Sequence, residues 1–288
     1  MKLVAGGFAH IESYAMVVAA MLSIAIAGSP SDNGVNAVDR PRDSPIINGH
    51  THAFVDVHQP LYAAVGRFTG SMACTAAIVA HPRIITTAGH CIAQKTQSSR
   101  PRHFSFQPGY QTGADLGLFE ATVWTIGASQ KVERQSAHDA ANDWAILVLE
   151  HAPIDVRPFL LSHDPSDVLS SFERRMILPS YSRDAAGEQI LTVDSACAVR
   201  ERVWGVLVHD CKASPGSSGA PLLVRDQQWY AVVGIHSGSI WAADEGGRVA
   251  KLIGNSAIGS WAFDDALQEL ERRLESGEDV YRDAARIY

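Results

Sequence analysis

The sequence has no excess of positive charge, because 24 lysines and arginines stand against 31 aspartates and glutamates and give a formal net charge of −7. A nucleic-acid-binding domain usually carries a basic patch or stripe, so this balance argues against nucleic acid as a partner. The chain also lacks internal repeats, like-charge runs and long low-complexity tracts. Its 288 residues can form a proper core, in one large domain or two smaller ones.

The apolar run near the N-terminus is short. It covers residues 15–27 (AMVVAAMLSIAIA), whereas a membrane span takes roughly 20 residues, and it ends in Ala25-Ile26-Ala27, a pattern typical of signal-peptide cleavage. Lys2 is the only lysine or arginine ahead of it and Glu12 offsets its charge, so Met16 is an alternative start. We predict a signal peptide over 1–27 and a secreted protein, extracellular or periplasmic; an apolar anchor or a buried helix is the alternative. The polar residues 28–45 read as a propeptide or disordered linker.

Cysteine is scarce, with four residues and no C-x-x-C pair, which disfavours a zinc site. An even number of cysteines behind a signal peptide favours disulfides. Three pairings are possible, and the sequential one, Cys74–Cys91 with Cys197–Cys211, closes two short loops that would each add about 3 kcal/mol of stability. His50, His52 and His58 are the remaining metal candidates, since His50 and His52 would share a strand face. We expect no metal and no cofactor.

Long helices alternating with strands are absent too, which argues against a parallel sheet. Short apolar runs separated by turn residues instead predict an all-β sandwich or barrel. The predicted strands are Ala76–Ala80, Ala121–Ile126, Ala145–Leu149, Arg175–Leu178, Gln189–Val193, Val203–Val208, Pro221–Val224 and Tyr230–Ile235. The predicted turns include Gln107-Pro108-Gly109, Ala186-Gly187, Ser237-Gly238 and Glu245-Gly246-Gly247.

The C-terminus differs from this β pattern. Apolar residues recur at helical spacing from Phe263 to Leu274, with acidic residues near the start of the segment and arginines near its end, as the helix dipole favours. We therefore predict a helix that packs on the β body and ends near Gly277, with a second short helical piece towards Tyr288.

Three short segments carry the candidate chemistry. Ser218 lies in ASPGSSGAPLL (213–223), and a serine nucleophile needs a base and an orienting carboxylate. His90 follows an apolar strand and precedes Cys91, whose bond to Cys74 would hold it in place. Asp143 opens the apolar strand of NDWAIL (142–147), where it could be partly buried against an imidazole.

Together the motifs TAGHC, NDWAIL and GSSGAP, in that order, resemble the chymotrypsin-like serine peptidases, in particular the bacterial glutamyl-endopeptidase-like (V8-like) branch. An α/β-hydrolase is disfavoured, since its nucleophile motif is G-x-S-x-G and its order is Ser, Asp, His. The resemblance implies two antiparallel six-stranded β-barrels, over 46–150 and 151–262, followed by a C-terminal helical extension over 263–288. It spans roughly residues 46–262.

The same resemblance implies the roles of the site residues. Ser218 matches the nucleophile, His90 the general base and then acid, and Asp143 its orienter. The backbone amides of Gly216 and Ser218 match the oxyanion hole, and a glycine suits a backbone that must turn its N–H inward.

Ser217 departs from the digestive enzymes, which have an aspartate at this place that pairs with the N-terminal amine freed by activation. Ser217 cannot form that ion pair, although Ile46-Ile47-Asn48-Gly49 resembles the family's mature N-terminus. The glutamyl-endopeptidase branch also lacks that aspartate. The spacing of Cys197 and Cys211 also differs, and fits a hairpin clamp ahead of the serine turn.

The expected substrate-binding residues are His236, Ser237 and Gly238, on the strand that lines the specificity pocket, and Lys212. His236 matches a histidine that contacts the substrate carboxylate in glutamyl-specific relatives, and a satisfied core histidine is the alternative. Lys212 would favour an acidic side chain by charge complementarity, unless it points to solvent. Ala213 lacks the hydroxyl that such enzymes often place beside the pocket.

These features predict a secreted serine endopeptidase that forms an acyl-enzyme on protein or peptide substrates and prefers an acidic residue before the cut. We expect a monomer with no membrane span after processing. Two alternatives remain: a catalytically silent binding protein of this fold, although no triad residue is lost, and a periplasmic quality-control protease, although 263–288 is too short for a peptide-binding module.

Overall fold

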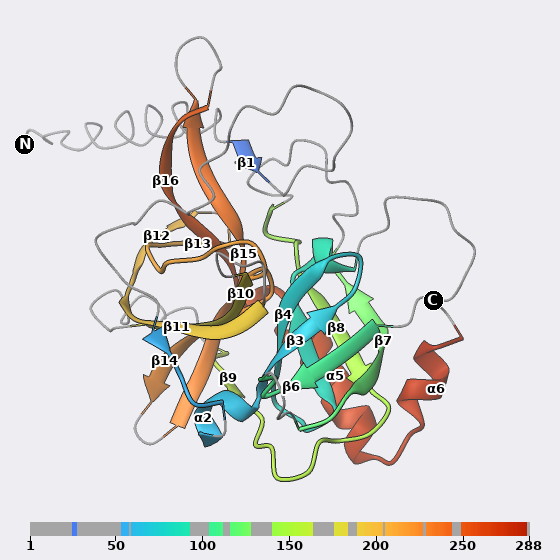
Figure 1. Cartoon of the computed structure of the whole chain (residues 1–288). Coiled ribbons are helices and arrows are strands. Elements are labelled where there is room, and N and C mark those ends of the chain that lie inside the picture. Colours follow the sequence, from blue (N-terminus) through green and yellow to red (C-terminus); the bar gives the residue numbers. More distant parts are fainter. Residues whose placement is uncertain are drawn as a thin grey trace, which may run out of the picture.

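The computed structural model describes residues 25–27, 53–57, 59–92, 104–111, 116–127, 140–163, 176–183, 189–203, 205–226, 229–243 and 249–286. Figure 1 shows a body made almost entirely of strands, in two parts that meet side by side, with the C-terminal helices against the green and cyan part. The all-β chymotrypsin-like class predicted from the sequence is confirmed.

The first part is a closed six-stranded barrel with the strand order β3-β4-β5-β8-β7-β6. Its strands are β3 (Val65–Thr69), β4 (Ala73–Ile78), β5 (Ile84–Thr87), β6 (Phe104–Pro108), β7 (Phe119–Ile126) and β8 (Ala145–Leu149). All neighbouring pairs are antiparallel. Strand β6 alternates buried and half-buried residues, as a strand with one face on the core does, whereas β5 and β8 are buried on both faces.

The second part is a ten-stranded sheet, so the expected count of six strands holds for the first part and not for this one. Its main order is β12-β13-β16-β15-β14-β10-β11-β2, and β1 and β9 pair separately with β15. The strands are β1 (Ala25–Ala27), β2 (Ala53–Phe54), β9 (Leu160–Leu161), β10 (Met176–Arg183), β11 (Gln189–Cys197), β12 (Val199–Val203), β13 (Val206–His209), β14 (Pro221–Asp226), β15 (Trp229–Ala243) and β16 (Val249–Gly259).

Two local predictions in this sheet are wrong. Ser237-Gly238 is not a turn but lies inside β15, because pairing with β16 carries the strand through a bulge between His236 and Gly238. The predicted strand Val203–Val208 is a tight hairpin between β12 and β13, because Gly205 has a φ of +89°, a left-handed conformation that glycine adopts without steric cost.

The predicted C-terminal helix is confirmed as α5 (Asp264–Glu275), and a short second helix, α6 (Val280–Ala284), follows it. Gly277, just after the end of α5, has a φ of +81°. Leu267 and Leu270 are fully buried in the core cluster that the barrel shares with part of the sheet. Within the described residues the remaining helical pieces are α2 (Pro60–Ala63), η1 (Gly89–Cys91) and η3 (Ser260–Ala262). Across the described part of the chain, no helix has the length and apolar character needed to cross a membrane.

The barrel and the sheet are joined by hydrogen bonds between β4 and the sheet. The Thr75 amide donates to the Ser218 carbonyl at 2.8 Å, and the Thr75 hydroxyl accepts from the Tyr181 amide at 2.9 Å. The Tyr181 hydroxyl donates to the Tyr110 carbonyl at 2.9 Å. The segments that carry the candidate residues therefore meet at this junction.

Some predictions fall outside the described residues. They are the greater part of the signal peptide, the segment 28–45, the Ile46–Gly49 motif, His50, His52 and His58, and the turns at Ala186-Gly187 and Glu245-Gly246-Gly247.

Candidate active site

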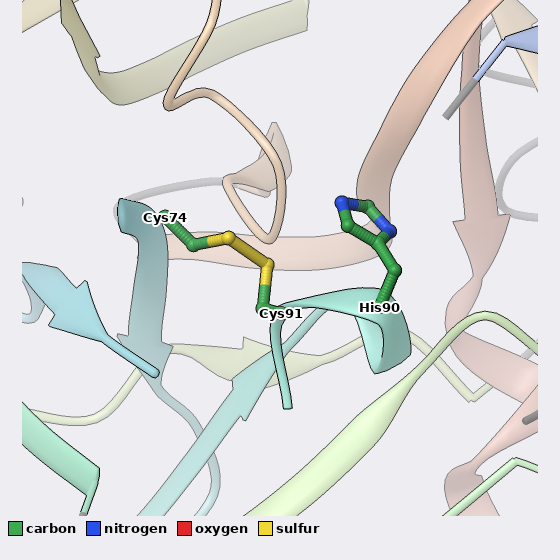
Figure 2. Close-up of side chains that lie close together, drawn as sticks. All are labelled: Cys74, His90 and Cys91. Atoms are coloured by element: carbon green, nitrogen blue, oxygen red, sulfur yellow. A yellow bond between two sulfur atoms is a disulfide. The ribbon is translucent and has the colours of Figure 1, made fainter. Parts of the chain in front are cut away.

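His90 stands at the centre of the short helical turn η1, immediately after β5. Gly89 allows this turn to approach the neighbouring chain, because a Cβ there would lie 3.1 Å from both the Asp143 carboxylate and the Trp144 amide. Cys91 is bonded to Cys74 of β4, as the sequential pairing predicts. Figure 2 shows the imidazole of His90 next to the Cys74–Cys91 disulfide, and the imidazole and the two sulfurs have atoms within 4.8 Å of one another. The disulfide thus anchors the turn beside the imidazole, whose side chain is only 13% exposed.

Asp143 is buried at the start of β8 and accepts hydrogen bonds on both carboxylate oxygens. Its Oδ1 takes the His90 amide at 2.7 Å, and its Oδ2 lies 2.7 Å from His90 Nδ1. The Ser237 hydroxyl donates to the same Oδ2. This two-point contact fixes the position of the imidazole relative to its own backbone.

The pKa values of this pair move apart. Burial alone would raise the pKa of Asp143, but the charge of His90 and the hydrogen bonds from His90 and Ser237 outweigh burial and lower it. Burial alone would lower the pKa of His90, but the Asp143 carboxylate outweighs it and raises the pKa above its usual value. An ionised Asp143 requires a proton on His90 Nδ1, so the neutral imidazole carries its free lone pair on Nε2.

Ser218 is placed by the tight turn that precedes β14. Gly219 packs this turn against the barrel at a φ of +86°, where a Cβ would come within 2.2 Å of Thr75 and Thr87 oxygens. The Ser218 carbonyl accepts from the Thr75 amide and lies 3.9 Å from Cys91 Sγ. The structure therefore brings the serine turn against the disulfide next to His90. In the structure, no hydrogen bond joins Ser218 Oγ to the imidazole of His90.

Gly216 begins the same turn at a φ of +103°, and a Cβ there would lie 2.4 Å from the Tyr181 carbonyl oxygen. The amides of Ser217, Gly219 and Ala220 all donate to carbonyl oxygens. The amides of Gly216 and Ser218 donate to no group in the described residues. Two neighbouring donors are thus available to an incoming oxygen atom.

His236 and Ser237 follow one another on β15 but point to different partners. The Ser237 hydroxyl donates a hydrogen bond to Asp143, a contact that the sequence did not indicate. His236 is buried and its Nδ1 lies 3.1 Å from Nε2 of His209, a residue that the sequence analysis did not single out. The two rings meet edge to face at 5.2 Å between centroids. The pairing follows from the register of β13 and β15 on either side of β16, and no local sequence signal marks it.

The two histidines are both neutral at ordinary pH. Burial lowers the pKa of His209 to about 3. Burial, and then the charge of His209, lower the pKa of His236 well below its usual value. His209 and His236 therefore form an uncharged pair close to the candidate catalytic residues.

Lys212 lies just after the second disulfide, Cys197–Cys211, which clamps the β12–β13 hairpin as expected. Its amide donates to the Asp194 carboxylate at 2.8 Å. Asp210 braces the other side, accepting from the Ala198 amide at 2.7 Å. The backbone of Lys212, one of the predicted pocket residues, is thus held by the Asp194 carboxylate.

A metal-ligand grouping within the described residues comprises Cys74, His90 and Cys91. The two sulfurs are bonded to each other in the disulfide, so neither is a thiolate that could bind a metal. Only the imidazole of His90 remains as a ligand in this grouping.

Comparisons with known proteins agree with the fold. The family model for the trypsin-like peptidase domain matches residues 74–235. A solved structure titled "Structure of Glu endopeptidase in complex with MPD" superposes with a TM-score of 0.57 at 18% identity, covering 79% of this chain and all of the other. No curated protein matches the sequence.

Proposed function

Because the chain belongs to the trypsin-like peptidase domain family, we propose that it is a serine endopeptidase with Ser218, His90 and Asp143 as its catalytic triad. The carrying observation is the two-point hold of Asp143 on His90, through the amide and through Nδ1 at 2.7 Å each. That hold leaves Nε2 as the base atom, which is the tautomer that proton transfer from a serine requires.

In the proposed reaction, Ser218 Oγ attacks the substrate carbonyl carbon while its proton passes to Nε2 of His90. The substrate oxygen becomes an oxyanion, and the unused amides of Gly216 and Ser218 supply its hydrogen bonds. The protonated His90 then gives its proton to the leaving amine, the C–N bond breaks, and an acyl-enzyme remains. Water, deprotonated by Nε2, releases the acid and restores Ser218.

The missing Ser218–His90 hydrogen bond fits this scheme. Contacts of this kind are often long in the free enzyme and shorten only when the substrate is bound. Asp143 meanwhile stays ionised and balances the charge on the imidazolium as it forms.

We further propose that the pocket prefers an acidic residue before the cut. His209 Nε2 and His236 Nδ1 lie 3.1 Å apart, so one of these two ring nitrogens donates to the other. We propose the tautomer in which His209 donates from Nε2 to His236 Nδ1, so that His236 carries its own proton on Nε2. A neutral Nε2–H donor beside the triad can bind a substrate carboxylate, and Lys212 would add charge complementarity.

The protein is proposed to be exported. Its two disulfides indicate an oxidising compartment, since such bonds are rare in the cytosol of mesophiles. Cleavage of the predicted signal peptide after Ala27 completes this proposal.

Peptides that differ only at the residue before the cut, assayed with the oxidised protein, test both parts. We expect cleavage after Glu or Asp, and loss of that cleavage in H90A but not in H151A, a control at an exposed histidine. Efficient cleavage after Lys or Arg would overturn the acidic preference alone. Absence of any cleavage would overturn the endopeptidase.

A further inference from the structure

Ser217 is fully buried next to the proposed nucleophile, and the mechanism above gives it no role. Its hydroxyl faces two serines of β10, with Ser180 Oγ at 3.0 Å and Ser182 Oγ at 2.8 Å. Those two hydroxyls lie 2.9 Å apart, so the three form a closed triangle, which we call the hydroxyl ring. All three residues are almost or fully inaccessible to solvent.

The hydroxyl ring satisfies its own hydrogen-bonding needs without any charge. Each serine has one proton to donate, and three protons supply the three sides of the triangle. The Ser214 amide donates to Ser217 Oγ at 3.1 Å, and the Thr192 hydroxyl lies within 3.5 Å of Ser182 Oγ. A buried polar network is stabilising when every member is paired, as here.

The hydroxyl ring sits where it can aim both free amides. Ser217 is the residue between Gly216 and Ser218, so tying its side chain to β10 fixes the two peptide units that flank it. A trans peptide points its C=O and N–H in opposite directions. The Pro215 carbonyl accepts from the Arg183 amide of β10 at 2.9 Å, so the Gly216 N–H faces away from β10.

The next peptide units are held in the same way. The Gly216 carbonyl accepts from the Thr75 hydroxyl at 2.9 Å. The Ser217 carbonyl accepts from the Ala220 amide at 2.9 Å, which directs the Ser218 N–H to the opposite side. The side chain and both carbonyls of this stretch are therefore anchored.

We propose that the hydroxyl ring of Ser180, Ser182 and Ser217, together with these anchored carbonyls, positions the oxyanion amides, so that the site forms without a charged chain terminus. It takes the place of the aspartate–amine ion pair that the resemblance assigns to digestive enzymes. The proposal rests on the proposed serine-peptidase function and goes beyond it, because it names what assembles the site. The three serines are positioning residues, since they touch the turn rather than the substrate.

The first consequence is a flat pH profile on the alkaline side. An α-amino group loses its proton at about pH 7.7–8.0, so a site held by such an amine weakens above that pH. Hydroxyl groups do not titrate there. We expect the rate constant for Ser218 labelling by a fluorophosphonate to stay constant within twofold from pH 8 to pH 10. A fall with a midpoint near pH 8 would overturn the proposal.

The second consequence is a split between rate and binding. S217A removes one corner of the ring and lets the turn shift, and a displacement of about 1 Å can cost roughly 100-fold in rate. We expect kcat and the labelling rate to fall by about 10- to 100-fold in S217A, with KM changed less than threefold. S182A breaks the ring from β10, outside the turn, and should show the same split.

S260A is the matched control, because Ser260 is equally buried and donates a hydrogen bond to the Ser162 carbonyl at 2.6 Å. If S217A and S182A lose no more activity than S260A at equal melting temperature, the hydroxyl ring has no positioning role while the peptidase stands. If the wild-type chain neither labels nor cleaves, the proposed function falls and this inference falls with it. The wild-type pH profile decides the matter even where a variant fails to fold.

Discussion

The barrel and the sheet hold their halves of the proposed active site by different chemistry. On the barrel side a charged pair, Asp143 and His90, sits beside a disulfide. On the sheet side, two neutral clusters lie at the site: the hydroxyl ring around Ser217 and the pair His209–His236. The pH dependence of the activity should therefore come from Asp143 and His90 on the barrel side. The groups on the sheet side should affect the activity through their geometry and packing.

The largest expected effect comes from breaking the charged half. D143N keeps the shape of the side chain but lets His90 carry its proton on the wrong nitrogen, and in the well-studied member of this peptidase family that change costs about 10⁴-fold in kcat. We expect a loss of similar size in peptide cleavage. D265N, at an exposed aspartate of α5, is the control and should keep full activity. A D143N variant within tenfold of wild type would contradict the role of Asp143.

The next largest effect comes from the geometry of the neutral half. G216A places a Cβ 2.4 Å from the Tyr181 carbonyl at a φ of +103°, so the turn must move and the amide is misaimed. Losing one oxyanion donor costs about 10²–10³-fold in kcat. G277A has an equally positive φ of +81° with open space around it, and should change stability slightly without changing kcat. Steady-state kinetics of both variants measure the difference.

The two disulfides give a stability comparison between the halves. Cys74–Cys91 and Cys197–Cys211 are separated by 17 and 14 residues, so removal of either pair should lower the free energy of unfolding by about 3 kcal/mol. Denaturant titration of C74A/C91A and C197A/C211A checks this. Because Cys91 follows His90 directly, we expect the first variant to lose more kcat than the second. Equal kcat in the two variants would argue against an anchoring role for Cys74–Cys91.

The smallest effect is the pH response of the intact enzyme. His90 accepts a proton from Ser218 only while its Nε2 is unprotonated, and Asp143 raises the pKa of His90 above the ordinary 6.5. The rate should therefore be full at alkaline pH and fall tenfold per pH unit as the pH drops through a midpoint above 6.5. A pH profile of kcat/KM measures the midpoint. A midpoint below 6.5 would mean that burial, not Asp143, dominates at His90.

The residues of the proposed triad could be predicted from the sequence, because His90, Asp143 and Ser218 each lie in a short motif whose meaning is local. The C-terminal helix was equally readable from its 3.6-residue period. Gly216 was also visible, since its required backbone angle constrains the residue type at that one position.

The rest depends on strand register, which local patterns do not encode. The Ser237–Asp143 and His209–His236 contacts join residues 94 and 27 positions apart. Ser237-Gly238 has the composition of a turn, yet pairing with β16 holds it extended. The hydroxyl ring needs β10 beside the serine turn, and serines at 180 and 182 look like ordinary strand residues until that neighbour is known.

Mass spectrometry of the oxidised protein after fluorophosphonate treatment tests the central claim most directly. The account predicts one phosphonyl group, located on Ser218, absent in S218A and still present but formed more slowly in S217A. Unmodified Ser218 in folded wild-type protein, or modification on Ser217 instead, would contradict it.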